Sequence, residues 1–402
     1  MPANLNNQRF YSLDVFRGAT VCLMILVNNP GSWSHIYGPL KHAEWHGVTP
    51  TDLVFPFFLF AVGNALAFVM PKLENEGAAA FWKKIIKRTL LIFAIGVFLN
   101  WMPFVKWQND NIVFKPWIFV NASGKEEGIR ILGVLQRIAI AYFFASALIY
   151  LLKIKKAFVA ALIILLGYWF LCVFFNPSDP YSLSGWFGTN VDKAILGEAH
   201  MYHGERLNGI PVAFDPEGLM SSLAAIAQVM FGYFCGDYII KNGKTSAMLN
   251  GLFAGGLIFM LTGYMWDMVF PMNKKIWSSS YTIFTTGMAM CIIALMIYKI
   301  ELQNKRNALT KFFDVFGKNP LFIFFLSGFL PRALGLIRIP NGISDTGAAL
   351  YLTPFNWFYE NICKPIFPNN LNNGSLLYAF VMITFYWLIV YIMDKKKVYI
   401  KV

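Results

Sequence analysis

Charged residues are scarce in this sequence. Asp, Glu, Lys and Arg make up 14% of the 402 residues, whereas a soluble globular protein carries about 25%. Hydrophobic residues make up 57%, and apolar runs of the roughly 20 residues that cross a bilayer core recur along the chain. The composition therefore excludes an ordinary soluble fold and predicts an all-α polytopic integral membrane protein.

Cysteine is also rare, and no C-x-x-C pair occurs among the five residues of this type. Four of them lie inside apolar runs and only Cys363 lies outside one, so we interpret them as small buried hydrophobic side chains. The polar start MPANLNNQRFYS lacks the pattern of a cleavable signal peptide. The first apolar run is therefore expected to remain as a membrane span.

The apolar runs predict about ten spans within a single transmembrane domain, 1–402. Pro56 is expected to kink the second span and Pro320 to break the ninth. The segment 349–367 contains Pro and polar residues, and it either crosses the membrane or lies at its surface. The predicted spans are about 13–28, 51–70, 85–103, 129–152, 156–175, 219–240, 247–270, 276–298, 312–335 and 374–394.

The net charge of +13 reflects topology. Lys and Arg gather in alternate short connections, including 71–84 and 299–311, and in both termini, and such connections face the cytoplasm. Lys274 and Lys275 are the exception, on the opposite side. Both termini are therefore predicted to be cytoplasmic, with the lipid bilayer as partner and no nucleic acid.

All five histidines fall in two of the long connections on the outer side. His42 and His46 form an H-x-x-x-H pair, but no carboxylate or thiol follows at a recognised metal-ligand spacing, so no metal is expected. Histidine titrates near neutral pH. Proton chemistry, if any, is therefore predicted on the outer face.

Ionisable residues in the spans have two interpretations each. Asp14 and Arg17 share a helix face, either as an interfacial ion pair or as an anion site for a cytosolic ligand. Arg137 lies two turns into a span, where it either pairs structurally or lines a polar cavity.

Polar residues also mark helix ends. Asn28 and Asn29 close the first span, as a cap or as an amide donor to an oxyanion. Thr49-Pro50-Thr51-Asp52 has the pattern of a helix start with a carboxylate at its third position, and Asp215-Pro216-Glu217 is expected to open the sixth span in the same way.

Several segments taken together resemble a known family. SLDVFRG, MILVNN and KHAEWHGVTPTDLVFPFFLF, together with LGVLQRIAIAYFF, AFDPEGLMSS, NKKIWSSSY and FGKNPLFIFF, are similar to the heparan-alpha-glucosaminide N-acetyltransferase family. Its bacterial branch includes the NagX-type proteins of amino-sugar use. The resemblance implies a polytopic enzyme, here of a bacterial inner membrane. Such an enzyme moves acetyl from cytosolic acetyl-CoA to the amine of a glucosamine-type sugar across the membrane.

The resemblance also assigns residues. It implies His42 as the catalytic histidine and Asn28 as the active-site asparagine, with Asn29 as a substitute. The candidates for binding CoA are Arg9, Asp14, Arg17 and Arg137, of which the arginines would hold its phosphates. Those for binding the amino sugar are Asp52, Asp215 and Glu217.

Two alternatives stay open at this point. His42 acts as a general base or carries the acetyl group covalently. The protein is an acetyltransferase or an amino-sugar permease without chemistry, since intramembrane charges and broken helices also occur in transporters. The oligomeric state is open as well, a homodimer being one candidate.

Overall fold

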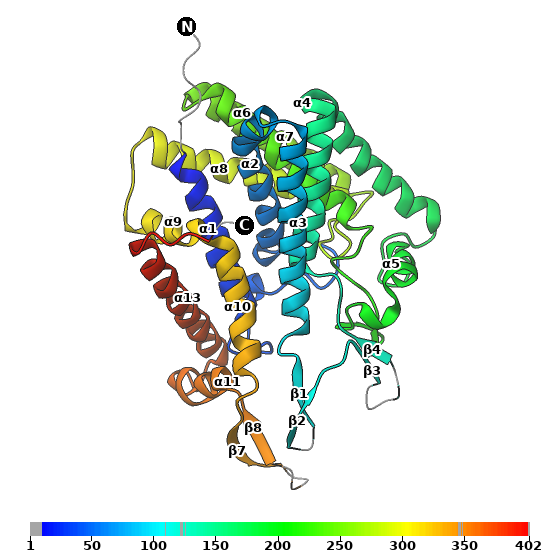
Figure 1. The fold of residues 1–402 in the computed structure, drawn as a ribbon, viewed down its shortest axis with the longest axis vertical. Helices are drawn as coiled ribbons and strands as arrows, with labels where there is room; N and C mark the ends of the chain where they lie inside the picture. The colour runs from blue at the N-terminus through cyan, green and yellow to red at the C-terminus, as the bar shows by residue number, and fades with distance from the viewer. Residues whose placement is uncertain are drawn as a thin grey trace.

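The computed structural model describes residues 10–108, 110–120, 124, 126–344, 347 and 349–400. Long helices dominate it (Figure 1), and the prediction of an all-α polytopic membrane protein is confirmed. The long helices are α1 (Tyr11–Asn28), α2 (Val54–Asn75), α3 (Ala78–Trp101), α4 (Val134–Phe175), α6 (Ser222–Asn242), α7 (Ser246–Asp267), α8 (Ser279–Ile297), α9 (Ala308–Lys318), α10 (Pro320–Leu334) and α13 (Leu371–Lys395).

Within the described residues, four antiparallel hairpins lie in the connections between helices. They pair β1 (Val105–Gln108) with β2 (Asn111–Phe114), β3 (Ile118–Val120) with β4 (Glu126–Gly128), β5 (Glu205–Leu207) with β6 (Ile210–Val212), and β7 (Ile339–Ile343) with β8 (Ala349–Leu352). The short helices are α5 (Gly188–Leu196), α11 (Pro354–Phe358) and α12 (Lys364–Ile366).

Among the described residues, seven helices are long and apolar enough to cross a membrane, or eight if α9 and α10 form one bent span. The predicted number was about ten, and two features explain the difference. Lys153 has a non-helical φ of 57°, so α4 joins two of the predicted spans across a kink. The first half of α3 carries Lys83, Lys84, Lys87 and Arg88, which shortens its apolar part.

The two proline expectations have different outcomes. The chain bends by 77° between α9 and α10, where Pro320 begins α10, as expected. The expected kink at Pro56 is wrong, because Pro56 lies in the first turn of α2. The first N–H groups of a helix have no partner within it, so a proline there removes no helical hydrogen bond.

Glycines let α2 and α6 pack closely. A Cβ on Gly63 would lie 1.8 Å from the carbonyl oxygen of Val229, and one on Gly232 would lie 2.1 Å from that of Phe60. Small residues allow helix backbones to approach in this way within membranes. This contact fixes α2, and with it the loop that precedes α2, against the rest of the bundle.

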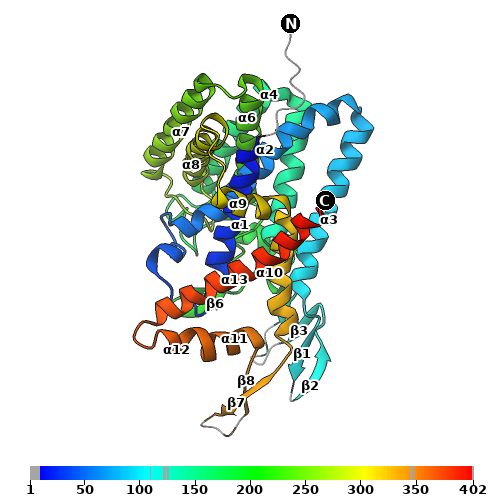
Figure 2. The ribbon, with the colours of Figure 1, turned by 90° about the vertical axis from the view of Figure 1, so that its left-hand side faces the viewer.

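The bundle has two distinct ends, which we call the N-terminal end and the hairpin end. Figure 2 shows the N-terminus at one end and the hairpins β1/β2 and β7/β8 at the other. Since α1 starts at the N-terminal end, the loop after Asn28 lies toward the hairpin end.

Candidate functional site

A histidine and an aspartate form the centre of the site. His42 Nδ1 lies 2.6 Å from Asp52 Oδ1. The Asp52 side chain is 1% exposed, whereas that of His42 is 41% exposed. A buried carboxylate that accepts the Nδ1 proton orients the ring and leaves the Nε2 lone pair for chemistry.

Local structure holds Asp52 in place. It lies in the 3-10 turn Pro50–Leu53, which Thr49 caps as predicted. Its Oδ2 accepts hydrogen bonds from the backbone N–H groups of Ala43 and Thr49, at 3.0 and 3.1 Å. From α8, the Tyr281 hydroxyl donates to the Asp52 carbonyl oxygen at 2.5 Å. The carboxylate therefore has one orientation, fixed from both ends of the loop and from a distant helix.

Lys274 completes this group. Its Nζ lies 3.0 Å from His42 Nδ1, 3.3 Å from His42 Nε2 and 3.6 Å from Asp52 Oδ1. Burial lowers the pKa of Lys274, although Asp52 and Glu217 oppose that shift. Lys274 was not among the residues that the sequence assigned to the site. Two signals marked it: it lies in the NKKIWSSSY segment, and with Lys275 it is an exception to the charge asymmetry of the loops.

The acidic pair before α6 binds an arginine. Arg130 Nε donates to Asp215 Oδ2 at 3.0 Å and its Nη2 to Asp215 Oδ1 at 2.5 Å. Nη2 also contacts Glu217. Burial alone would raise the pKa of Glu217, but Arg130 outweighs it and the pKa is lowered. Asp215 is fully buried and Glu217 is 13% exposed, and both pair with Arg130, whose single positive charge balances one of the two carboxylates.

Arg137 lies at the hairpin end, apart from Arg17. It is fully buried and donates to the carbonyl oxygen of Pro216 at 2.6 Å and to Ser221 Oγ. Ser221 is the N-cap of α6, so the expectation that Asp215 opens this helix is wrong. Arg137 thus stabilises the entry to α6, and the structure does not bring it together with Arg17.

A cavity of about 290 Å³ lies between α1, α3, α4 and α10. Asn28 lines it with an exposed side chain. Asn29 also borders it, but its Nδ2 donates to the Ile25 carbonyl oxygen at 3.0 Å and so caps α1. The other polar residues of the lining are Asn100, Arg130, Gln136, Ser327 and Arg332. Arg130, in the lining of this cavity, pairs with Glu217, whose charge in turn acts on Lys274.

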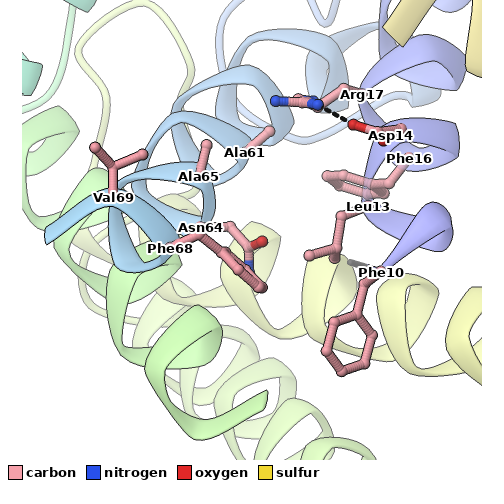
Figure 3. A pocket seen from close by; sticks show the side chains of 10 residues that line it. All are labelled: Phe10, Leu13, Asp14, Phe16, Arg17, Ala61, Asn64, Ala65, Phe68 and Val69. Carbon is pink, nitrogen blue, oxygen red and sulfur yellow. Dashed lines mark hydrogen bonds and ion pairs between the residues drawn. The ribbon is translucent and has the colours of Figure 1, made fainter. Parts of the chain in front are cut away.

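A second cavity, of about 320 Å³, lies between α1 and α2 at the N-terminal end. Arg17 and Asp14 form an ion pair at one side of it, and Phe10 and Phe68 lie at the other (Figure 3). The Asn64 side chain extends from α2 between them. Asn64 is 3% exposed, and its Nδ2 has no hydrogen-bond partner among the described residues. Arg9 precedes this cavity in sequence but lies outside the described residues.

Two of the other loop histidines have partners other than His42. His35 contacts Ser32 and Ser34, and His200 Nδ1 lies 2.7 Å from the Ile129 carbonyl oxygen. Within the described part of the chain, no group of three or more His, Cys, Asp or Glu side chains is arranged to hold a metal ion. Of these three histidines, only His42 contacts a carboxylate.

The fold and these side chains define an integral membrane protein with a histidine–aspartate site at one end of a helical bundle. Residues 9–192 match the family model described as heparan-alpha-glucosaminide N-acetyltransferase, catalytic. This segment contains Asn28, His42 and Asp52, and the match confirms the resemblance seen in the motifs.

Two curated relatives agree with this assignment. The chain is 26% identical to heparan-alpha-glucosaminide N-acetyltransferase of Homo sapiens over 345 residues, which cover 73% of this chain and 49% of that protein. It is 26% identical to the protein of the same name from Mus musculus, over 73% of this chain and 50% of that protein. The chain thus spans about half the length of these relatives.

Proposed function

We propose that this protein is a membrane N-acetyltransferase that uses acetyl-CoA and acetylates the amine of a glucosamine-type sugar. The observation that carries the proposal is the His42 imidazole bonded to the buried Asp52 within the segment that matches the family. The acetyl donor binds from the cytoplasm and the acceptor from the far side of a bacterial inner membrane. The two cavities, which lie toward opposite ends of the bundle, support this division.

The chemistry follows from the His42–Asp52 pair. Aminolysis of a thioester joins the amine nitrogen to the acetyl carbon, breaks the carbon–sulfur bond and releases a proton from nitrogen and a thiolate from CoA. The Nε2 lone pair of His42 takes the proton, and the imidazolium returns it to the thiolate. Asp52 holds the ring for both transfers, and it compensates the charge on the imidazolium.

Asn28 is proposed to stabilise the oxyanion that forms on the acetyl carbonyl. A preorganised amide donor is suited to this role. The capping role falls to Asn29, so the Asn28 amide is not committed to the helix end. The adjoining cavity is proposed to receive the sugar, with Glu217 near its ammonium and Asp215 holding Arg130.

The cavity between α1 and α2 is the proposed donor site. CoA carries phosphates, which arginine binds through its planar group of donors. Arg17 and Arg9 supply that charge, and Asp14 orients Arg17. The buried Nδ2 of Asn64 has no hydrogen-bond acceptor in the part of the chain that the structure describes, and it is suited to donate to a polar group of the ligand. Arg137, at the other end, is not part of this proposal.

The general-base and relay mechanisms use the same Nε2 lone pair and differ in one intermediate. A relay forms an acetyl-histidine before the sugar binds, whereas a base does not. Rapid quenching of the protein with labelled acetyl-CoA in the absence of sugar distinguishes them. Labelled protein that disappears when sugar is added, and that is not formed by His42→Ala, identifies the relay.

The proposal is tested by incubating purified protein with labelled acetyl-CoA and a panel of amino sugars. We expect acetylated sugar with the wild type and a loss of about 10²–10⁴-fold in His42→Ala, the usual contribution of general-base catalysis. His35→Ala, altered in the same loop, is expected to keep its activity. Near-normal turnover of His42→Ala at saturating substrates would contradict the role of this residue.

A permease is the second candidate, because the 77° bend between α9 and α10 resembles the interrupted helices of transporters. Proteoliposomes loaded with labelled amino sugar separate the two. Movement of unmodified sugar that is equal in wild type and His42→Ala favours the permease. Product formation that requires His42 favours the enzyme.

A further inference from the structure

Lys274 lies close to the imidazole of His42. Its Nζ is 3.0 Å from Nδ1 and 3.3 Å from Nε2. Asp52 accepts the hydrogen bond of the Nδ1–H group, so Nδ1 has no lone pair to offer Lys274. A cation at this distance disfavours a second positive charge on the ring, because like charges repel.

The turn that carries Lys274 is rigid. Asn273 Oδ1 accepts hydrogen bonds from the backbone N–H groups of Lys275 and Ile276, at 2.7 and 3.0 Å. Ser278 Oγ accepts another from the Asn273 N–H at 3.0 Å, and both of these side chains are fully buried. Trp277 has a φ of +52°, which is uncommon for a bulky residue and persists only where the surroundings impose it. Lys274 is thus held by its backbone as well as by Asp52.

The neighbouring lysine has a different environment. Lys275 Nζ lies 2.8 Å from Glu205 Oε2, on the β5/β6 hairpin, and it faces the ring of Trp45. Its charge is therefore neutralised by Glu205. Lys274 and His42 both contact Asp52. Lys274 Nζ lies 3.6 Å from Asp52 Oδ1, whereas His42 Nδ1 lies 2.6 Å from the same oxygen.

We propose that Lys274 is a positioning residue of the transfer reaction, whose ammonium keeps His42 neutral with its proton on Nδ1. This inference rests on the proposed function. The charged groups that surround the imidazole and Lys274 are Asp52 from the turn before α2, Lys275 beside it, and Glu217, which is paired with Arg130. Tyr281 of α8 fixes Asp52 through its backbone.

Removal of the ammonium has a predictable direction. Without Lys274, Asp52 is the charged group that contacts the ring, and a carboxylate favours the imidazolium. More of His42 is then protonated at a given pH, and the imidazolium has no lone pair with which to accept the proton of the amine. The acidic limb of the pH–rate profile should therefore move to higher pH.

The test compares Lys274→Met with Lys275→Met, a change of the same kind one residue away. Lys274→Met is expected to shift the acidic limb upward by about one pH unit or more, the usual effect of one close charge. On the alkaline plateau, where His42 is neutral in both proteins, the turnover of Lys274→Met should differ less from the wild type than it does on the acidic limb. Lys274→Arg restores the wild-type limb because the charge is kept, and Lys275→Met leaves it unchanged. An unshifted limb in Lys274→Met would overturn the proposal.

A second measurement does not depend on activity. In protein labelled with ¹³C-histidine, the ring signal that is absent from His42→Ala reports the protonation of His42 directly. Its titration midpoint should rise by about one pH unit in Lys274→Met and stay constant in Lys275→Met. If the protein transfers no acetyl group, the proposed function fails but this midpoint still tests Lys274. An unchanged midpoint refutes the role of Lys274 whatever the activity.

Discussion

Asn29 donates two hydrogen bonds to Ile25: its backbone N–H lies 3.1 Å and its side-chain Nδ2 3.0 Å from the same carbonyl oxygen. The last carbonyls of a helix have no partner within it, so this double contact closes α1. Of two adjacent asparagines, one therefore has a structural role, and the other, Asn28, borders the cavity.

The two asparagines should consequently respond differently to substitution. Asn28→Ala is expected to lower acetyl transfer by about 10²–10³-fold, as for the loss of one oxyanion donor, with little change in melting temperature. Asn29→Ala should lose roughly 1 kcal/mol of stability, one hydrogen bond's worth, and keep most of its turnover. Turnover and thermal unfolding in detergent measure both. A larger loss of activity in Asn29→Ala would reverse the assignment.

Arg17→Ala should weaken acetyl-CoA binding by about 10–100-fold, because a charge-assisted hydrogen bond to phosphate is worth about 1.5–3 kcal/mol. Calorimetry on the purified protein gives the dissociation constant. Lys84→Ala, which removes an exposed cation paired with Glu76, is the control and should bind normally. Unchanged binding by Arg17→Ala would leave Arg17 as a partner of Asp14 alone.

Asp192 should make stability depend on pH. Burial raises its pKa to about 7, although the Leu219 N–H bond opposes that shift. Because the folded pKa lies above the ordinary value of 3.8, the neutral carboxyl contributes stability at low pH. That contribution is complete below about pH 3.8 and is lost as the pH rises from there to about 7. Asp192→Asn keeps the acceptor for Leu219 and removes the charge.

We therefore expect Asp192→Asn to melt at a higher temperature than the wild type at pH 8, with a smaller difference at pH 5. Glu198→Gln is the matched control in the same region. Its side chain is 42% exposed and pairs with Lys193, so its melting curve should parallel the wild type at both values. Equal melting of wild type and Asp192→Asn at pH 8 would show that Asp192 is not neutral in the fold.

The orientation in the membrane is predicted from the loop charges. In Glu76→Cys, the connection between α2 and α3 should resist a membrane-impermeant thiol reagent added to intact cells and react once the cells are opened. Ile195→Cys, whose position in α5 is 63% exposed, should react from outside. The unaltered protein reports the reactivity of its own cysteines. Labelling of position 76 in intact cells would contradict the predicted orientation.

The fold was largely predictable because its signals are local. Long apolar runs predicted the helices, and Pro320 predicted the bend, since both act on the residues around them. The expectation for Pro56 failed because the effect of a proline depends on where the helix starts. Pro50 and Asp52 lie in a separate 3-10 turn, so α2 starts at Val54 and Pro56 falls in its first turn.

The candidate site was only partly predictable. His42 and Asp52 lie ten residues apart within one of the segments that carry the family resemblance, and a single loop joins them. The partners of Arg130 and Arg137 lie about 80 residues away in sequence, and those contacts arise from the packing of α4 against α6. No property of an arginine within its own segment indicates which distant group it will meet. Lys274 escaped notice for the same reason.

The separation of 232 residues between His42 and Lys274 has a consequence for biosynthesis. At about 5–20 residues per second, the ribosome needs about 10–50 s after making His42 before it makes Lys274. During that interval Asp52 also lacks Tyr281, which comes later still in the chain. The segment 9–192, which matches the family model, therefore contains His42 and Asp52 but neither Lys274 nor Tyr281. A nascent chain released after that segment would enter the membrane with the histidine in place but the site unfinished.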